Sequence, residues 1–191
     1  MTTHPPSPER RSFLARFTPP GLPATPGQQL PVTTFAAFAA GIERTLVAAY
    51  DSLLDRVSEE VRPLLETYRA HHREHAEVLA GLAAGEDGVG PDEGLVASLT
   101  PRIDEISGTS DALVLARELE DRMAATYAHA LTRLEDADAA GEVASVLAVE
   151  ASHGASLGEL VEDALDARFP DGAFETTDQS RGFSPGTGAP G

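Results

Sequence analysis

The stretches FAAGIERTLVAAY (residues 38–50) and LARELEDRMAATY (residues 115–127) align without a gap, and they decide how we interpret the fold. In each stretch a Glu is followed seven residues later by a Tyr, a spacing that places both side chains on one face of a helix. The two pairs are Glu43 with Tyr50 and Glu120 with Tyr127. The repetition predicts a duplicated helical unit.

A second polar pair follows each stretch at a nearly constant distance. From the Glu of the stretch to the last member of the pair is 32 residues in the first half and 33 in the second. The pairs are His72 with His75 and Glu150 with His153. Recurrence of the polar positions in the same order predicts a duplicated helix hairpin with ionisable groups facing inward.

Apolar residues recur at steps of three and four in four segments, which predicts four helices. The predicted helices span residues 33–57, 59–83, 110–134 and about 139–168. We expect Thr33 or Thr34 to cap the first helix, and Ser110 or Asp111 to cap the third. The connection at residues 84–109 is long enough to cross the bundle and to hold a short helix near 94–106. The pattern therefore predicts an all-α four-helix bundle at 33–168, made of two antiparallel helix hairpins joined by a long crossover.

Both ends of the chain are rich in Pro or Gly and lack this periodicity. We expect a disordered N-terminal tail at 1–32, which contains eight Pro, and a flexible Pro/Gly-rich C-terminal tail at 169–191. The pair Arg10-Arg11 resembles the core of a twin-arginine export signal, but residues 15–32 lack the apolar stretch that such a signal needs. We expect a cytoplasmic protein, and the arginine pair leaves export open.

Composition excludes several classes of function. The chain has 191 residues and a net charge of −17, so its surface repels nucleic acid. It has no Cys, which excludes disulfides and sites built from thiolates. The longest apolar run, residues 35–42, is far shorter than the roughly 20 residues that a membrane span needs. We expect no nucleic-acid partner and no membrane span, and the sequence leaves open whether the chain forms a homo-oligomer.

Three Glu residues fall within the apolar stripes, namely Glu43, Glu120 and Glu150. Buried carboxylates are costly unless paired, and three at similar depth repel one another. Arg44 and Arg122 lie off the stripes, and we expect them to point to solvent. One or two divalent cations would resolve the conflict of charge, since metal sites in bundle cores are built from Glu and Glu-x-x-His on facing helices.

The sequence thus predicts a metal site in the core. The candidate ligands are Glu43, His72, His75, Glu120, Glu150 and His153. The hydroxyls of Tyr50 and Tyr127 could brace the carboxylates from outside the ligand set. Taken alone, Glu43 or Glu120 would more often be a surface residue, and His72 or His75 would more often be a hydrogen-bonded core residue. The prediction therefore depends on the whole set. His71 and His129 fall off the stripes, and we expect both to be exposed to solvent.

Three segments resemble the ferritin-like superfamily, and more narrowly a group of bacterial ferritin-like domain proteins. They are HHREHAEVLAGL (71–82), LEDRMAATYAHAL (119–131) and VEASHGASLGEL (149–160). The resemblance covers residues 33–168 and implies a ferritin-like four-helix bundle of the di-iron-carboxylate type. The superfamily's site takes a Glu from the first and third helices and Glu-x-x-His from the second and fourth. Carried over, its ligands are Glu43, His75, Glu120, Glu150 and His153.

One position departs from the superfamily pattern, because His72 stands where the second helix should have a Glu. The change removes one negative charge and one bridging ligand. The implied di-metal site is therefore asymmetric, and a site for a single ion is an alternative. Oxygen and nitrogen ligands without sulfur favour iron or manganese, with zinc as an adventitious occupant.

Three functions are compatible with these features. The first is a redox-active metalloprotein, such as a non-haem di-metal oxidase, peroxidase or ferroxidase that uses one or two iron or manganese ions. The second is a non-catalytic ferritin-like bundle with a structural or partner-binding role. We rank iron storage in a cage last, because storage ferritins add a fifth helix and residues 169–191 are poor in helix-forming residues.

Overall fold

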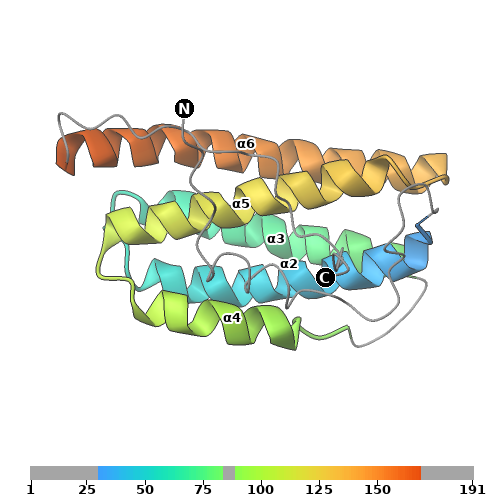
Figure 1. The fold of residues 1–191 in the computed structure, drawn as a ribbon, viewed down its shortest axis with the longest axis horizontal. Coiled ribbons are helices and arrows are strands. Elements are labelled where there is room, and N and C mark those ends of the chain that lie inside the picture. The colour runs from blue at the N-terminus through green and yellow to red at the C-terminus, as the bar shows by residue number, and fades with distance from the viewer. Residues whose placement is uncertain (1–29, 84–88, 169–191) are drawn as a thin grey trace, which may run out of the picture.

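The computed structural model describes residues 30–83 and 89–168, and all regular structure in these residues is helical. The helices are α2 (Val32–Leu54), α3 (Arg62–Leu82), α4 (Glu93–Asp104), α5 (Thr109–Leu131) and α6 (Ala137–Arg168). The four long helices run lengthwise beside one another, and α4 lies along α2 (Figure 1). The predicted all-α fold is confirmed for this part of the chain.

The long helices associate in two pairs that follow one another along the chain. Most contacts of α2 are with α3, and most contacts of α5 are with α6. Short connections at residues 55–61 and 132–136 join the members of each pair. Further contacts join α2 to α5 and α3 to α6, so the two pairs face each other across a common interior. This packing is compatible with the predicted bundle of two hairpins.

The crossover between the pairs contains α4 and is held against α2. The backbone amide of Asp92 donates to the carbonyl of Gly41 (3.2 Å) and to the hydroxyl of Thr45 (2.8 Å). A Cβ at position 41 would lie 3.3 Å from the carbonyl oxygen of Gly90, so glycine permits this close approach. The short helix predicted near 94–106 corresponds to α4.

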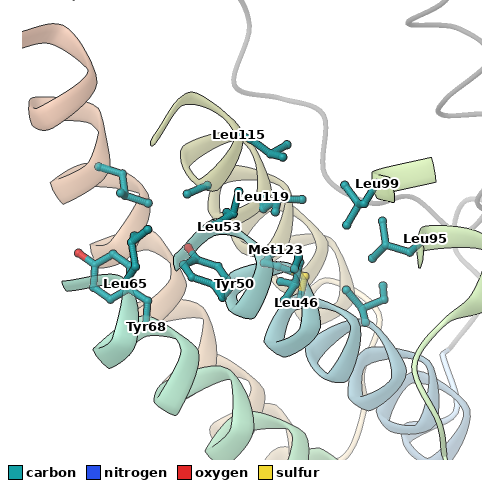
Figure 2. Packing of buried hydrophobic residues seen from close by; sticks show 14 of the residues in the cluster. Leu46, Tyr50, Leu53, Leu65, Tyr68, Leu95, Leu99, Leu115, Leu119 and Met123 are labelled. Atoms are coloured by element: carbon teal, nitrogen blue, oxygen red, sulfur yellow. The ribbon is translucent and has the colours of Figure 1, made fainter. Parts of the chain in front are cut away.

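The apolar core includes side chains from α4 as well as from the long helices. Leu95 and Leu99 are buried, and Figure 2 shows them projecting from α4 towards α2 and α5. Burial of a leucine side chain typically contributes about 1.5–3 kcal/mol. The crossover helix therefore covers and stabilises the outer side of α2, the helix that carries Glu43.

The boundary of the predicted N-terminal tail needs a correction. Leu30 is buried, and its amide donates to the carbonyl of Arg133 (3.1 Å). Residues 30 and 31 thus belong to the folded part, and α2 begins at Val32, because the apolar side chain of Leu30 contributes to the core. The rest of the predicted tails, with the arginine pair, lies outside the described residues.

Both predicted helix caps are wrong. The cap position of α2 is Pro31 and that of α5 is Gly108, and neither provides a side-chain cap. Asp111 instead accepts a hydrogen bond from the amide of Ser107 (3.1 Å), which organises the turn before α5. Tertiary packing of the apolar faces sets where these helices begin, without help from a capping residue.

Helix α2 is long and apolar enough to cross a membrane by length and composition. However, 61% of the relevant window is buried inside the structure. A core helix of a soluble protein passes the same test, so this is weak evidence for a membrane span.

Candidate metal centre

The structure brings all six predicted ligand residues together between the two helix pairs. Glu43 comes from α2, His72 and His75 from α3, Glu120 from α5, and Glu150 and His153 from α6. The three carboxylates and His72 are 0% exposed, and the other two histidines are 8% and 3% exposed. The residues lie in the apolar stripes because their spacing of three, four or seven keeps them on the inward face of each helix.

The six residues form two overlapping groups. Within each group, one ligand atom from every residue lies within 4.8 Å of the ligand atoms of the others. The first group is Glu43, His72, His75 and Glu150, and the second is His72, Glu120, Glu150 and His153. Each group contains two carboxylates and two imidazoles. His72 and Glu150 belong to both groups, so they occupy the middle of the cluster.

His72 lies between the carboxylates of the two halves. Its Nδ1 is 2.7 Å from Oε2 of Glu43, and its Nε2 is 3.0 Å from Oε1 of Glu120. Burial by itself would lower the pKa of His72, but the charges of Glu120, Glu150 and Glu43 outweigh it and raise that pKa well above its usual value. Without a cation, the imidazole is therefore protonated and neutralises its neighbours.

His75 and His153 each face one carboxylate closely. Nδ1 of His75 is 2.6 Å from Oε1 of Glu150, and Nδ1 of His153 is 3.0 Å from Oε2 of Glu120. Burial opposes protonation of His75, but its contacts with Glu150 and Glu43 raise its pKa to about 9. Both residues direct a ring nitrogen towards the carboxylates, as a metal ligand must.

Two tyrosines each donate a hydrogen bond to one of the carboxylates. The hydroxyl of Tyr50 donates to Oε1 of Glu120, and that of Tyr127 donates to Oε1 of Glu43. Each hydrogen bond joins α2 to α5, so the tyrosine of one half supports the glutamate of the other. Burial first, and then the adjacent carboxylates, raise the pKa of both tyrosines, which keeps them protonated as donors. The predicted bracing contacts are present.

The three carboxylates are not equivalent. Burial works against ionisation of Glu43 and Glu120, but the charge of His72 outweighs it and lowers the pKa of both. Burial raises the pKa of Glu150 well above its usual value, and the charge of Glu43 adds to the effect. Both carboxylate oxygens of Glu150 are buried and have no partner in hydrogen-bonding geometry. Glu150 is therefore the residue that a cation would satisfy most directly.

The arginines near the cluster differ from their predicted placement. Arg44 and Arg122, expected to point to solvent, are half-buried. Nη2 of Arg122 lies 2.8 Å from Oε1 of Glu118 on its own helix. The ion pairs of the three central carboxylates, within the described residues, are with histidines.

Two residues beside the cluster were not predicted to take part. His71 is half-buried, not exposed, and its Nδ1 lies 2.9 Å from Nε2 of His153. Burial, followed by the charge of His153, lowers the pKa of His71. The ring of Tyr68 stacks on His153, with a centroid distance of 3.8 Å. His71 and Tyr68 precede His75 by four and seven residues, a spacing that places both near the inward face of α3. His129 is exposed, as predicted.

Comparisons with known proteins agree with the helical fold. A family model described as a ferritin-like domain matches residues 36–163, a range that includes all six residues of the two groups. No curated protein and no solved structure matches the chain.

Proposed function

The chain belongs to the ferritin-like domain family, and on this premise we propose that it is a metalloprotein that binds one or two iron or manganese ions. In this proposal, the four long helices form a ferritin-like four-helix bundle of two hairpins. The ions bind in its core, and the protein is redox-active towards dioxygen or peroxide, like an oxidase or ferroxidase.

The observation that carries the proposal is the environment of Glu150. Its two oxygens are buried without a hydrogen-bond partner, among two further carboxylates and three imidazoles. Burying a carboxylate in this condition is costly. A divalent cation would offset the repulsion between the carboxylates and supply the contacts that Glu150 lacks. The proposed ligands are Glu43, His72, His75, Glu120, Glu150 and His153.

The two residues shared by both groups bear on the number of ions. Glu150 offers two oxygens, and His72 has one ring nitrogen near Glu43 and the other near Glu120. Glu150 could contribute one oxygen to each of two neighbouring ions, whereas a neutral His72 has a lone pair on one ring nitrogen and could be a ligand of one ion. Three carboxylates and two divalent ions leave a net charge of +1, so a second ion is electrostatically acceptable. Because a neutral His72 could serve only one of the two ions, the ions would have unequal affinities.

The donor set favours iron or manganese, because it contains oxygen and nitrogen but no sulfur. When bound, such an ion supplies one-electron redox chemistry towards dioxygen or peroxide. The surrounding chain excludes bulk water from the ligands, since all six are buried. Tyr50 and Tyr127 hold Glu120 and Glu43 in position, and His72 and His75, whose pKa values are raised, would release protons as the ion binds.

Elemental analysis of the purified chain tests this proposal. We expect one or two iron or manganese ions per chain, and the double variant Glu150→Ala with His153→Ala should lose most of them. The matched control is Glu142→Ala with His129→Ala, because both of these residues are exposed. A wild-type chain that stays metal-free after anaerobic reconstitution with ferrous iron would contradict the proposal.

The second candidate is a non-catalytic bundle with a polar core, and the position of His72 favours it. The protonated imidazole lies between Glu43 and Glu120, and two tyrosines complete their contacts, so most of the charge is compensated without metal. This function predicts that apolar replacements of Glu43, Glu120 and His75 leave the melting temperature unchanged or raise it. A fall in melting temperature on chelation would count against it.

A further inference from the structure

His71 lies on the outer side of one proposed ligand. It follows Tyr68 by three residues on α3; the ring of Tyr68 stacks on the imidazole of His153 from α6, and the ring of His71 is nearly parallel to the same imidazole. The rings of His71 and His153 are inclined by only 9° with centroids 5.1 Å apart. His71 is half-buried, whereas His153 is buried, so His71 lies between that ligand and the surface of the molecule.

The two ring nitrogens of His153 have different neighbours. Nδ1 lies 3.0 Å from Oε2 of Glu120, within the group that could hold an ion. Nε2 lies 2.9 Å from Nδ1 of His71. An ion that replaces the proton between His153 and Glu120 must bind Nδ1. A neutral imidazole that binds an ion through Nδ1 carries its proton on Nε2, so that nitrogen must donate a hydrogen bond.

We infer that His71 is a positioning residue, which accepts a hydrogen bond from Nε2–H of His153 and thereby presents Nδ1 of His153 to the metal ion. The inference rests on the proposed function, since it concerns the orientation of a ligand of that site. A partner on the second nitrogen of a ligating histidine fixes its tautomer and ring orientation, and its loss typically lowers metal affinity about 10–100-fold. In the first half, both ring nitrogens of His72 contact carboxylates, and so does Nδ1 of His75.

His71 acts through His153 and does not itself belong to the ligand set. Its Nδ1 points at His153, and it is a member of neither group of ligand atoms. Loss of His71 should therefore weaken metal binding only at the site formed by His153, Glu120 and Glu150. The position that includes His75 and Glu43 should keep its affinity. An ordinary contribution to packing would not distinguish between the two positions.

The test is a titration of the metal-free full chain with Co²⁺, followed by visible absorption and equilibrium dialysis. His71→Phe keeps an aromatic ring but removes the acceptor, whereas His71→Asn places an oxygen where Nδ1 stands. His129→Phe, an exposed histidine on α5, is the matched control. We expect His71→Phe to weaken one class of Co²⁺ binding about 10–100-fold. The His71→Asn and His129→Phe variants should bind within a few-fold of wild type.

The possible results separate this inference from the proposed function. Wild-type Co²⁺ binding that His71→Phe leaves unchanged overturns the role of His71 alone. Equal weakening by His71→Phe and His71→Asn also overturns it, because the acceptor would then be irrelevant. A wild-type chain that binds no Co²⁺ overturns both. Nitrogen-15 NMR of the Zn²⁺-loaded wild type decides the matter without any variant: we expect the proton of His153 on Nε2, and a proton on Nδ1 would overturn the inference.

Discussion

At the scale of single residues, the cluster combines two carboxylates whose contacts stabilise the fold with a third whose burial destabilises it. Glu43 and Glu120 each have a histidine and a tyrosine as partners. Glu150 has neither kind of hydrogen bond and lies close to the other carboxylates. The contact with His75 offsets only part of the cost of burying this carboxylate, so a bound ion would stabilise Glu150 more than the metal-free fold does.

We therefore expect Glu150→Gln to change stability and metal affinity in opposite directions. The raised pKa of Glu150 means that its ionisation opposes folding above pH about 4.5, and a neutral amide removes this cost. The metal-free variant should be more stable at pH 7 by about 1–3 kcal/mol, measured by urea unfolding. Its affinity for ferrous iron should fall at least tenfold. Glu142→Gln, an exposed change on the same helix, should alter neither quantity.

The stability of the metal-free protein should also depend on pH through His75. Its pKa is raised to about 9, so the protonated imidazole stabilises the folded state. This contribution is complete below pH about 6.5, the usual histidine pKa, and disappears as the pH rises through about 9. We expect urea unfolding to show a loss of stability between pH 7 and pH 10. The loss should be smaller in His75→Asn and in the metal-loaded chain, and equal losses in all three would contradict the assignment.

At the scale of the helices, the contact between α5 and α6 depends on small residues beside the cluster. A Cβ at position 154 would lie 2.7 Å from Oδ1 of Asp121 and 3.6 Å from Cβ of Glu120. Gly141 on the same helix has nothing within 4 Å of such an atom. Glycine at position 154 therefore lets α6 approach the helix that carries Glu120.

This difference predicts opposite outcomes for two identical substitutions. Gly141→Ala should raise the free energy of unfolding by about 0.5–1 kcal/mol, because alanine favours a helix over glycine. Gly154→Ala should gain less than this or lose stability, because Asp121 must move away. Thermal or urea unfolding of both metal-free variants tests the comparison. Equal gains would show that the close contact at residue 154 is not important.

The existence of the helices could be predicted from the sequence, but their ends could not. Residues at steps of three and four face inward over most of each helix, including Phe35, Tyr50, Leu65 and Leu157. The helix starts were wrong where a Thr, Ser or Asp suggested a cap. The apolar periodicity that predicts a helix draws on many residues. A cap, in contrast, is one local interaction of about 1 kcal/mol that tertiary packing overrides.

At the scale of the whole molecule, the candidate centre joins the two helix pairs. The pair α2–α3 supplies three of the six residues, and the pair α5–α6 supplies the other three. Direct contacts between the pairs are fewer than those within each pair. An ion at this place would therefore connect two units that are otherwise joined through a smaller interface.

Metal loading should consequently slow hydrogen exchange in all four long helices. At a free metal concentration of 100 times Kd, binding stabilises a folded protein by about 2.7 kcal/mol. We expect amides around Glu43, His72, Glu120 and Glu150 to gain protection on addition of ferrous or manganous ion. Helix α4 contributes no ligand, so amides that exchange there by local opening should change least. Protection restricted to one helix pair would contradict a centre shared by both.

The sequence by itself determined the all-helical fold and the identity of the six buried Glu and His residues that are candidate ligands. It could do so because helical periodicity is a property of neighbouring residues along the chain, and the inward positions repeat in order. Only the tertiary structure decided how these residues meet: that each tyrosine supports the glutamate of the other half, that Glu150 has no partner in hydrogen-bonding geometry, and that His71 contacts His153. These relations depend on how the pairs face each other and how the helices are rotated, and spacing within one helix carries no information on either.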